Sequence, residues 1–165
     1  MGELIILRGN SGSGKTSVAK ALQQKLGFHT MLISHDMVRM QMLHVWGKEG
    51  VERSLPLMTE LVRYGAAHVP YTILEGVLDS AEYRALFETC VELYEGRIRA
   101  YYYDLPFEET LKRHQTKPNS RDFGETEMRR WWREKDFLPM IKETVLTKEM
   151  TLSETVEMIL SQITK

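Results

Sequence analysis

The chain has 165 residues, of which 42% are hydrophobic and 27% are charged. This length suits one domain with one sizeable core, and the composition is ordinary for a globular protein. The formal net charge of -1 excludes a global positive field that would attract nucleic acid or an anionic membrane. Any basic site must therefore be local.

Cys90 is the single cysteine, so the chain cannot form an internal disulfide, which fits a reducing compartment. The first residues lack the basic start and small-residue cleavage site of a signal peptide. No apolar run approaches the ~20 residues that are needed to cross a bilayer. We therefore expect a cytoplasmic protein with no membrane partner, and leave its oligomeric state open.

The first predicted element is a short apolar strand at residues 4–7, of the kind that is buried on both faces of a sheet. A helix is expected from Lys15 to Leu26, with an apolar stripe along one side and Gly27 as its stop signal. A second strand follows at residues 31–33. The chain thus begins with the pattern strand, helix, strand.

The same alternation continues to the end of the chain. Apolar residues at helical spacing predict helices over residues 55–69 and 83–94. Further strands are expected at residues 71–74, 98–103 and 144–146. Strands that alternate with helices predict an α/β fold, with a parallel sheet covered by helices on both faces.

The last third of the chain carries several start and stop signals. Asp104 is expected to cap a helix that has Pro106 in its first turn. A polar loop should span residues 115–127, and Thr151 with Glu154 forms a capping box at the start of the final helix. A helix rich in aromatic residues follows the loop and carries Met128, Trp131, Trp132 and Lys135. The two tryptophans could stack on a base, but we interpret them as anchors to the core.

A phosphate-binding loop is the strongest motif in the chain. The motif G-x-x-x-x-G-K-[ST] is matched in full by Gly9, Asn10, Ser11, Gly12, Ser13, Gly14, Lys15 and Thr16, and Ser17 follows. Its glycines let successive backbone N–H groups point at phosphate oxygens, and the helix that follows adds its positive end. Lys15 is expected to reach the β- and γ-phosphates, and the Thr16 hydroxyl to coordinate Mg²⁺. We expect ATP as the ligand, because the Asn-Lys-x-Asp guanine motif is missing.

Asp36 and Arg39 lie just past the strand predicted at residues 31–33. In parallel sheets, ligands bind beyond the carboxyl ends of the strands, which places this corner across the cleft from the γ-phosphate. Asp36 could take or orient the proton of an acceptor hydroxyl, or hold Mg²⁺, and Arg39 could hold a polar or anionic part of the acceptor. The alternative is a helix cap beside a solvated arginine.

Two predicted strands end in a carboxylate, Glu75 after residues 71–74 and Asp104 after residues 98–103. Either could hold Mg²⁺ through water. The helix-start pattern after Asp104 favours a structural role there. Glu75 has no such pattern and lies beside Gly76, which allows close backbone approach. Glu75 is therefore the candidate ligand for the metal or the acceptor, against the alternative of a plain surface acid.

Basic residues gather after the fourth predicted strand, where Arg113, Lys117 and Arg121 are spaced by four. Kinases bring positive charge to the transferring phosphoryl group when a segment closes and excludes water. We predict such a lid at about residues 113–135, with Arg113 and Arg121 acting on the phosphoryl group and Arg113 and Lys117 binding the nucleotide. Arg133 is interpreted as a solvated charge, and the roles of Arg129 and Arg130 stay open.

Together these motifs resemble the small P-loop kinases of the nucleoside monophosphate kinase-like superfamily. The likeness is narrower to the AAA-type or zeta-toxin-like branch, which includes chloramphenicol phosphotransferase and the kinase domains of polynucleotide kinases. It implies a three-layer fold with five strands in the order 2-3-1-4-5, and a catalytic aspartate at Asp36. Lysine stands at position 117, where related lids often have arginine.

The leading hypothesis is a kinase that uses ATP and Mg²⁺ to phosphorylate a hydroxyl of a metabolite, nucleoside or antibiotic. One alternative is a polynucleotide 5′-hydroxyl kinase, which the Asp-x-x-Arg spacing of Asp36 and Arg39 favours and the near-neutral net charge disfavours. Another is a nucleotide-binding regulator that transfers no phosphate.

Overall fold

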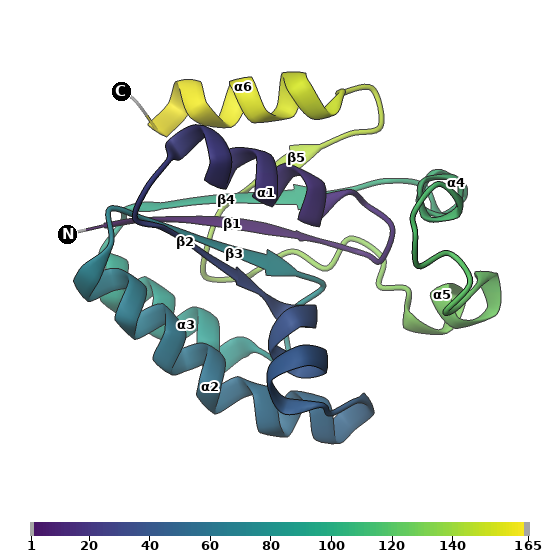
Figure 1. Cartoon of the computed structure of the whole chain (residues 1–165), viewed down its shortest axis with the longest axis horizontal. Helices are drawn as coiled ribbons and strands as arrows, with labels where there is room; N and C mark the ends of the chain where they lie inside the picture. The colour runs from purple at the N-terminus through teal and green to yellow at the C-terminus, as the bar shows by residue number, and fades with distance from the viewer. Residues whose placement is uncertain (1, 164–165) are drawn as a thin grey trace.

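The computed structural model describes residues 2–163 as a sheet of five parallel strands with helices on both faces (Figure 1). The strand order is β2-β3-β1-β4-β5, which confirms the predicted topology. The strands are β1 (Glu3–Gly9), β2 (Thr30–Ser34), β3 (Tyr71–Gly76), β4 (Ile98–Tyr103) and β5 (Glu143–Leu146). The helices are α1 (Lys15–Leu26), η1 (Met37–Leu43), α2 (Gly47–His68), α3 (Arg84–Tyr94), α4 (Phe107–Gln115), α5 (Glu125–Trp131) and α6 (Leu152–Ile163).

The helices form two outer layers around the sheet. Figure 1 shows α1 and α6 together on one face and α2 and α3 on the other. One apolar cluster therefore lies between the sheet and α1 with α6, and a second lies between the sheet and α2 with α3. Strand β1 runs through the middle, and the four side chains from Leu4 to Leu7 are all 0% exposed. This burial on both faces explains why the strand reads as a continuous apolar run.

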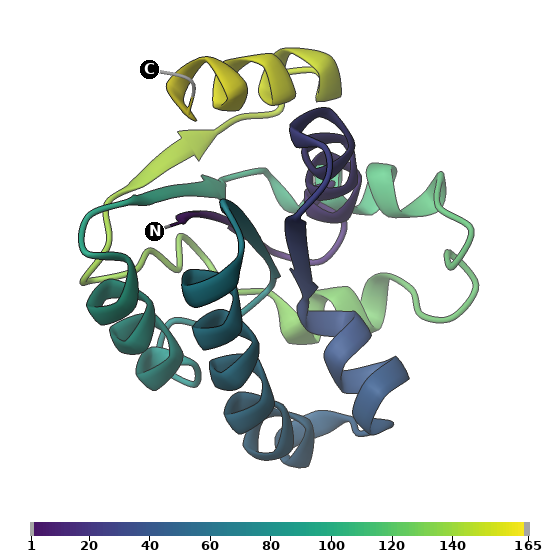
Figure 2. The same ribbon diagram turned by 60° about the vertical axis from the view of Figure 1, so that its left-hand side comes forward.

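The helices α4 and α5 lie apart from these layers, beyond the carboxyl end of the sheet (Figures 1 and 2). The strand arrows of β1, β3 and β4 all point toward this end. The loops after the strands therefore share one edge, as expected for a parallel α/β sheet.

Several predicted boundaries are confirmed by the backbone. Helix α1 spans Lys15–Leu26 and ends at Gly27, which has a φ of 84° that favours glycine. At α6, the amide of Glu154 donates to Oγ1 of Thr151 (3.1 Å) and the amide of Thr151 donates to Oε2 of Glu154 (3.1 Å). These reciprocal bonds form the capping box that the sequence indicated.

The interpretation of Asp104 as a helix cap is wrong. The N-terminal cap of α4 is Pro106, and Oδ2 of Asp104 instead lies 2.5 Å from Nζ of Lys135. The local pattern before a proline could not reveal this partner, because Lys135 is 31 residues further along the chain. Helix α2 also begins earlier than predicted, at Gly47 rather than residue 55.

Cys90 lies on the buried side of α3 and is 0% exposed. Burial raises the pKa of its thiol to about 12, so the reactive thiolate is scarce at neutral pH. We expect the native protein to resist alkylation by iodoacetamide at pH 8 and to react at one thiol per chain in denaturant, as mass spectrometry would show. Rapid stoichiometric labelling of the native protein would contradict this burial.

Candidate active site

The phosphate-binding loop joins β1 to α1 at the carboxyl edge of the sheet. Gly12 and Gly14 have φ angles of 85° and 99°, in the left-handed region that favours glycine. Gly14 is the cap residue of α1 and makes no side-chain cap, so the first N–H groups of the helix stay available to an anion. A Cβ on Gly12 would lie 2.4 Å from the carbonyl oxygen of Thr110, which shows how closely the loop packs against α4.

Lys15 lies buried inside this loop, with 7% of its surface exposed. Its Nζ donates to the carbonyl oxygen of Asn10 at 2.8 Å. Burial lowers the pKa of the ammonium to about 8, an effect that the charges of Glu75 and Asp36 partly oppose. Both carboxylates therefore lie close enough to Lys15 to act on it. These are the two carboxyl groups that the sequence assigned to the metal and to the acceptor.

Glu75 is the second-last residue of β3 and contacts the start of α1 through Thr16. The hydroxyl of Thr16 donates to Oε1 of Glu75 at 3.0 Å, and Glu75 is only 3% exposed. A hydroxyl and a buried carboxylate are hard oxygen donors of the type that Mg²⁺ prefers. Within residues 2–163 no group of three His, Cys, Asp or Glu residues could hold a metal by itself. The donor set thus fits a Mg²⁺ ion that also takes oxygens from phosphate and water.

Asp36 stands at the start of η1, a π-helix, which is a form found often at functional sites. Its Oδ1 accepts a hydrogen bond from Nη2 of Arg39 at 2.8 Å. The Asp36 side chain is 66% exposed, whereas Arg39 is 19% exposed. Partial desolvation would raise the pKa of the Asp36 carboxyl, but the hydrogen bond and charge of Arg39 outweigh it and hold that pKa below its usual value. Asp36 is therefore an exposed carboxylate at neutral pH.

A buried hydrogen-bond chain supports the corner that presents Asp36. Nε2 of His35 lies 2.5 Å from the hydroxyl of Tyr83, which lies 3.1 Å from Oγ of Ser54. Burial, helped by the charge of Arg39, lowers the pKa of His35 to about 3, so its ring is neutral. Gly76 leaves room for this ring, because a Cβ there would lie 2.5 Å from the Cβ of His35. A lone histidine offers no sequence pattern, and its role was missed.

Arg113 reaches the phosphate-binding loop from α4. Its Nη1 donates to the carbonyl oxygen of Ser13 at 2.7 Å, and its Nε pairs with Glu109 at 3.0 Å. Lys117 is half-buried, and burial lowers the pKa of its ammonium while Glu75 and Asp36 oppose that shift. Lys117 therefore lies near both carboxylates.

Arg121 is exposed in the turns between α4 and α5 and has no hydrogen-bond or ion-pair partner among residues 2–163. Arg113 thus contacts the phosphate-binding loop directly and Lys117 lies near the carboxylates of the site, whereas the catalytic role of Arg121 stays a prediction. Arg129 pairs with Glu125 and packs over the ring of Phe107, 4.1 Å from its centroid. Arg130 is exposed.

The interpretation of Trp131 and Trp132 as anchors to the main core is wrong. Trp131 packs edge-on against Phe123, with ring centroids 5.0 Å apart, and Trp132 packs against Phe107 at 5.4 Å. Both contacts join parts of the α4–α5 segment to each other. The tryptophans therefore stabilise the α4–α5 segment internally, and Trp131 stays 43% exposed.

Arg8 is a buried arginine beside the site, and no sequence motif indicated it. It precedes the phosphate-binding loop on β1 and is 0% exposed. Its guanidinium pairs with Asp136 (2.8 Å) and Glu143 (2.7 Å) and packs between the rings of Phe87 and Tyr102. Arg133, expected to be solvated, is half-exposed but pairs with Asp79 at 2.9 Å.

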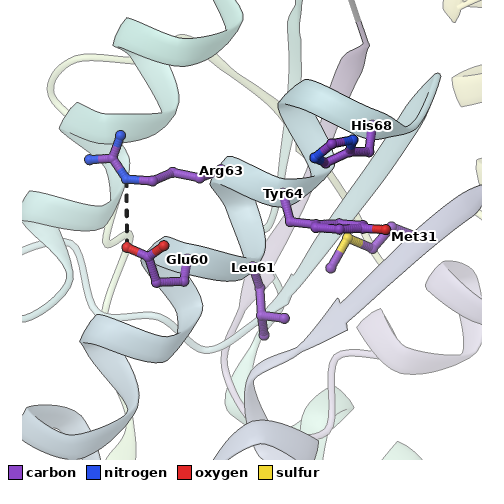
Figure 3. A pocket seen from close by; sticks show the side chains of 6 residues that line it. All are labelled: Met31, Glu60, Leu61, Arg63, Tyr64 and His68. Carbon is purple, nitrogen blue, oxygen red and sulfur yellow. Dashed lines mark ion pairs between the residues drawn. The ribbon is translucent and has the colours of Figure 1, made fainter.

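A surface hollow of about 640 Å³ lies away from these residues, beside α2 and β2 (Figure 3). Its lining includes Tyr64 and His68, whose ring centroids are 4.5 Å apart, and the pair of Glu60 with Arg63. No residue of the candidate active site lines it. The described part of the chain contains no helix long and apolar enough to cross a membrane.

The sheet and the loop together define a P-loop kinase-like fold, and solved structures of kinases share this architecture. A gluconokinase from Sinorhizobium meliloti is 17% identical (TM-score 0.65), with 99% of this chain and 91% of that chain covered. The APS kinase of Mycobacterium tuberculosis, solved with AMPPNP and APS, is 18% identical (TM-score 0.70; 99% and 98% covered). A shikimate kinase from Acinetobacter baumannii, solved with shikimate, is 19% identical (TM-score 0.60; 100% and 97% covered).

Residues 4–138 match the family model AAA_33, described as an AAA domain, and the chain belongs to this family. No curated protein sequence matches the chain. At these identities, the structural likeness establishes the fold and leaves the substrate open.

Proposed function

We propose that the protein is a kinase that transfers the γ-phosphoryl group of ATP to a hydroxyl of a small molecule, with Mg²⁺ as cofactor. The observation that carries this proposal is the hydrogen bond between the buried Glu75 and Thr16 of the loop that also buries Lys15. A triphosphate bound to Lys15 would lie near a carboxylate that can bind the metal, Glu75, and a carboxylate that can accept a proton, Asp36. Phosphoryl transfer needs this set of groups.

Each residue has a distinct task in this proposal. The backbone of the loop from Gly9 to Thr16 and the adjoining Ser17 would bind the phosphates, and Lys15 would pair with their charge. Thr16 would ligate Mg²⁺, Glu75 would hold it through water, and the bound ion would neutralise developing charge on the phosphates. Asp36 would accept the proton of the acceptor hydroxyl, and Arg39 would orient the acceptor. Arg113 and Lys117 would supply positive charge from α4 and the turn that follows it.

The surface around Asp36 favours a small, largely apolar acceptor over a polynucleotide. Residues 36–54 contain three acidic residues (Asp36, Glu49, Glu52) and three basic ones (Arg39, Lys48, Arg53), so the segment has no net charge. Two of its cations are already paired, Arg39 with Asp36 and Arg53 with Glu49. Polynucleotide binding requires several free cations for phosphates. The segment instead exposes apolar side chains, namely Met37, Met40, Met42 and Trp46.

The experiment that tests this function is ATP consumption in the presence of Mg²⁺ and panels of acceptors. The panels are phenicols, nucleosides, sugars and 5′-hydroxyl oligonucleotides. Transfer to a small alcohol supports the proposal. Transfer to oligonucleotides alone, with a steep fall at high salt, would move the protein to nucleic-acid end phosphorylation. Tight ATP binding without transfer to any acceptor would favour a regulator.

The variant Asp36→Asn should lower kcat by about 10²–10⁴-fold, because the amide cannot accept the hydroxyl proton. ATP affinity should change little, since Asp36 is proposed to act on the acceptor hydroxyl and not on the phosphates of ATP. Steady-state kinetics and calorimetry measure the two quantities. Near-normal turnover in Asp36→Asn would show that another group accepts the proton.

A further inference from the structure

The phosphate-binding loop is hydrogen-bonded to the segment that follows α5. Nδ2 of Asn10 donates to the carbonyl oxygen of Arg133 at 2.7 Å, and the amide of Arg133 donates to Oδ1 of Asn10 at 2.8 Å. Asn10 is 6% exposed. Both polar ends of its side chain are therefore occupied by backbone 123 residues away, and its side chain is not directed at a phosphate.

Arg8 forms ion pairs with two carboxylates of the same segment. Asp136 accepts from Nη2 of Arg8 at 2.8 Å and also from the amide and hydroxyl of Ser80, at 2.9 and 2.5 Å. Glu143 accepts from Nη1 of Arg8 and from the amide of Leu138. The return path from α5 to β5 is thus tied to β1 and to the loop after β3.

Asn10 also contacts the group that binds phosphate. Its carbonyl oxygen accepts from Nζ of Lys15 at 2.8 Å and from the hydroxyl of Ser13. A triphosphate must compete with this carbonyl for the ammonium of Lys15. When Lys15 moves to the phosphates, the carbonyl oxygen of Asn10 loses the hydrogen bond from the ammonium. The side chain of Asn10 is hydrogen-bonded to the backbone of Arg133, so a shift of Asn10 acts on Arg133 as well.

Helix α4 contacts the same loop, through Arg113 at the carbonyl oxygen of Ser13 and through the backbone of Thr110 against Gly12. The α4–α5 segment is therefore joined to the phosphate-binding loop at both of its ends. A change in the phosphate-binding loop can therefore be transmitted to both ends of the α4–α5 segment through these packing contacts and hydrogen bonds.

We propose that Asn10 is a positioning residue that couples nucleotide binding to the placement of the α4–α5 lid, through its paired hydrogen bonds to the backbone of Arg133, with Arg8 as the buried anchor of that segment. The inference rests on the proposed function only in that a nucleotide binds this loop. It requires neither an acceptor nor phosphoryl transfer.

Tryptophan fluorescence tests the coupling directly, because Trp131 and Trp132 lie at the end of α5. The variant Trp46→Phe removes the remaining tryptophan and serves as the background for all measurements. Titration with AMPPNP and Mg²⁺ should give a saturable change in emission. In Asn10→Ala we expect the change at saturation to fall by half or more, and Kd to rise by about 5-fold, a typical size for coupling between sites.

Arg133→Ala is the matched control, because it removes the side chain and its pair with Asp79 but keeps the backbone groups that Asn10 binds. It should keep the full fluorescence change. An Asn10→Ala protein with unaltered amplitude and Kd would overturn the proposal. An Arg133→Ala protein that loses the change to the same degree would also overturn it.

Hydrogen exchange of the Arg133 amide tests the same contact in the unaltered protein, should Asn10→Ala fail to fold. We expect protection of this amide to change several-fold when AMPPNP binds. Binding seen by calorimetry, without any response at Arg133 or in fluorescence, would refute the coupling and leave the kinase proposal intact. No nucleotide binding at all would refute both.

Discussion

Lys15→Ala should abolish phosphoryl transfer, with a loss of kcat/KM of about 10³-fold or more. A single preorganised donor to developing charge is worth about 10²–10³-fold, and Lys15 adds a full charge to the β- and γ-phosphates. Steady-state kinetics with the best acceptor measure this loss. A variant that keeps a tenth of the normal activity would show that the loop does not bind the reacting phosphates as proposed.

Loss of the Lys15 charge in the same variant should not destabilise the fold. This result would distinguish a lysine that serves function from one that stabilises the structure. Burial lowers the pKa of Lys15 from 10.5 to about 8, so the folded protein holds this proton less firmly than the unfolded chain. Between these values the unfolded state binds more protons, and the contribution of Lys15 to stability rises with pH. Denaturation of both proteins at pH 7 and pH 10 should therefore show that the stability of the unaltered protein improves relative to Lys15→Ala at the higher pH.

Arg8→Met should lower the free energy of unfolding by about 3–5 kcal/mol. It removes the shared cation of Asp136 and Glu143 and leaves the second carboxylate, whose side chain is 1% exposed, without its charge partner. The free energy of unfolding of a globular domain is about 5–15 kcal/mol in total, so this substitution would remove much of the stability. Chemical denaturation measures the difference in the free energy of unfolding.

A surface pair provides the control for this prediction. Lys25 and Glu157 lie 2.7 Å apart, as close as Arg8 and Glu143, but their side chains are 55% and 59% exposed. Lys25→Met should cost no more than about 1 kcal/mol, because water screens the pair. Addition of Glu143→Gln to Arg8→Met should recover part of the loss, since it removes the unpaired buried charge. Equal costs for Arg8→Met and Lys25→Met would contradict the role assigned to burial.

Local patterns predicted most of the architecture. The apolar run at β1, the glycine stop after α1 and the capping box of α6 each depend on neighbours within a few residues, so their physical causes are visible in the sequence. The phosphate-binding loop could be predicted for the same reason, because its glycines, lysine and threonine are neighbours in the sequence and shape one continuous stretch of backbone. Strand order came from resemblance to a family rather than from any local pattern.

Contacts between distant segments account for the errors and omissions. The sequence around Asp104 is typical of a helix cap. In the fold Asp104 instead forms an ion pair with Lys135, because the chain after α5 returns beside β4. Trp131 and Trp132 have an apolar pattern that does not distinguish the main core from a separate aromatic cluster. Spacing alone grouped Arg121 with Arg113 and gave no information on contacts: Arg113 reaches the phosphate-binding loop, and the role of Arg121 stays a prediction.

The sequence by itself determined that this protein has a phosphate-binding loop on a parallel α/β sheet, with Asp36 and Glu75 at the edge where ligands bind. Tertiary structure alone decided that Arg8 is a buried anchor, that Asn10 holds the backbone of Arg133, and that His35 is a neutral group under the corner of Asp36. The physical reason is that burial and pairing are properties of segments brought together by folding. The partners of Arg8 are 128 and 135 residues away, and no pattern in the neighbourhood of Arg8 indicates them.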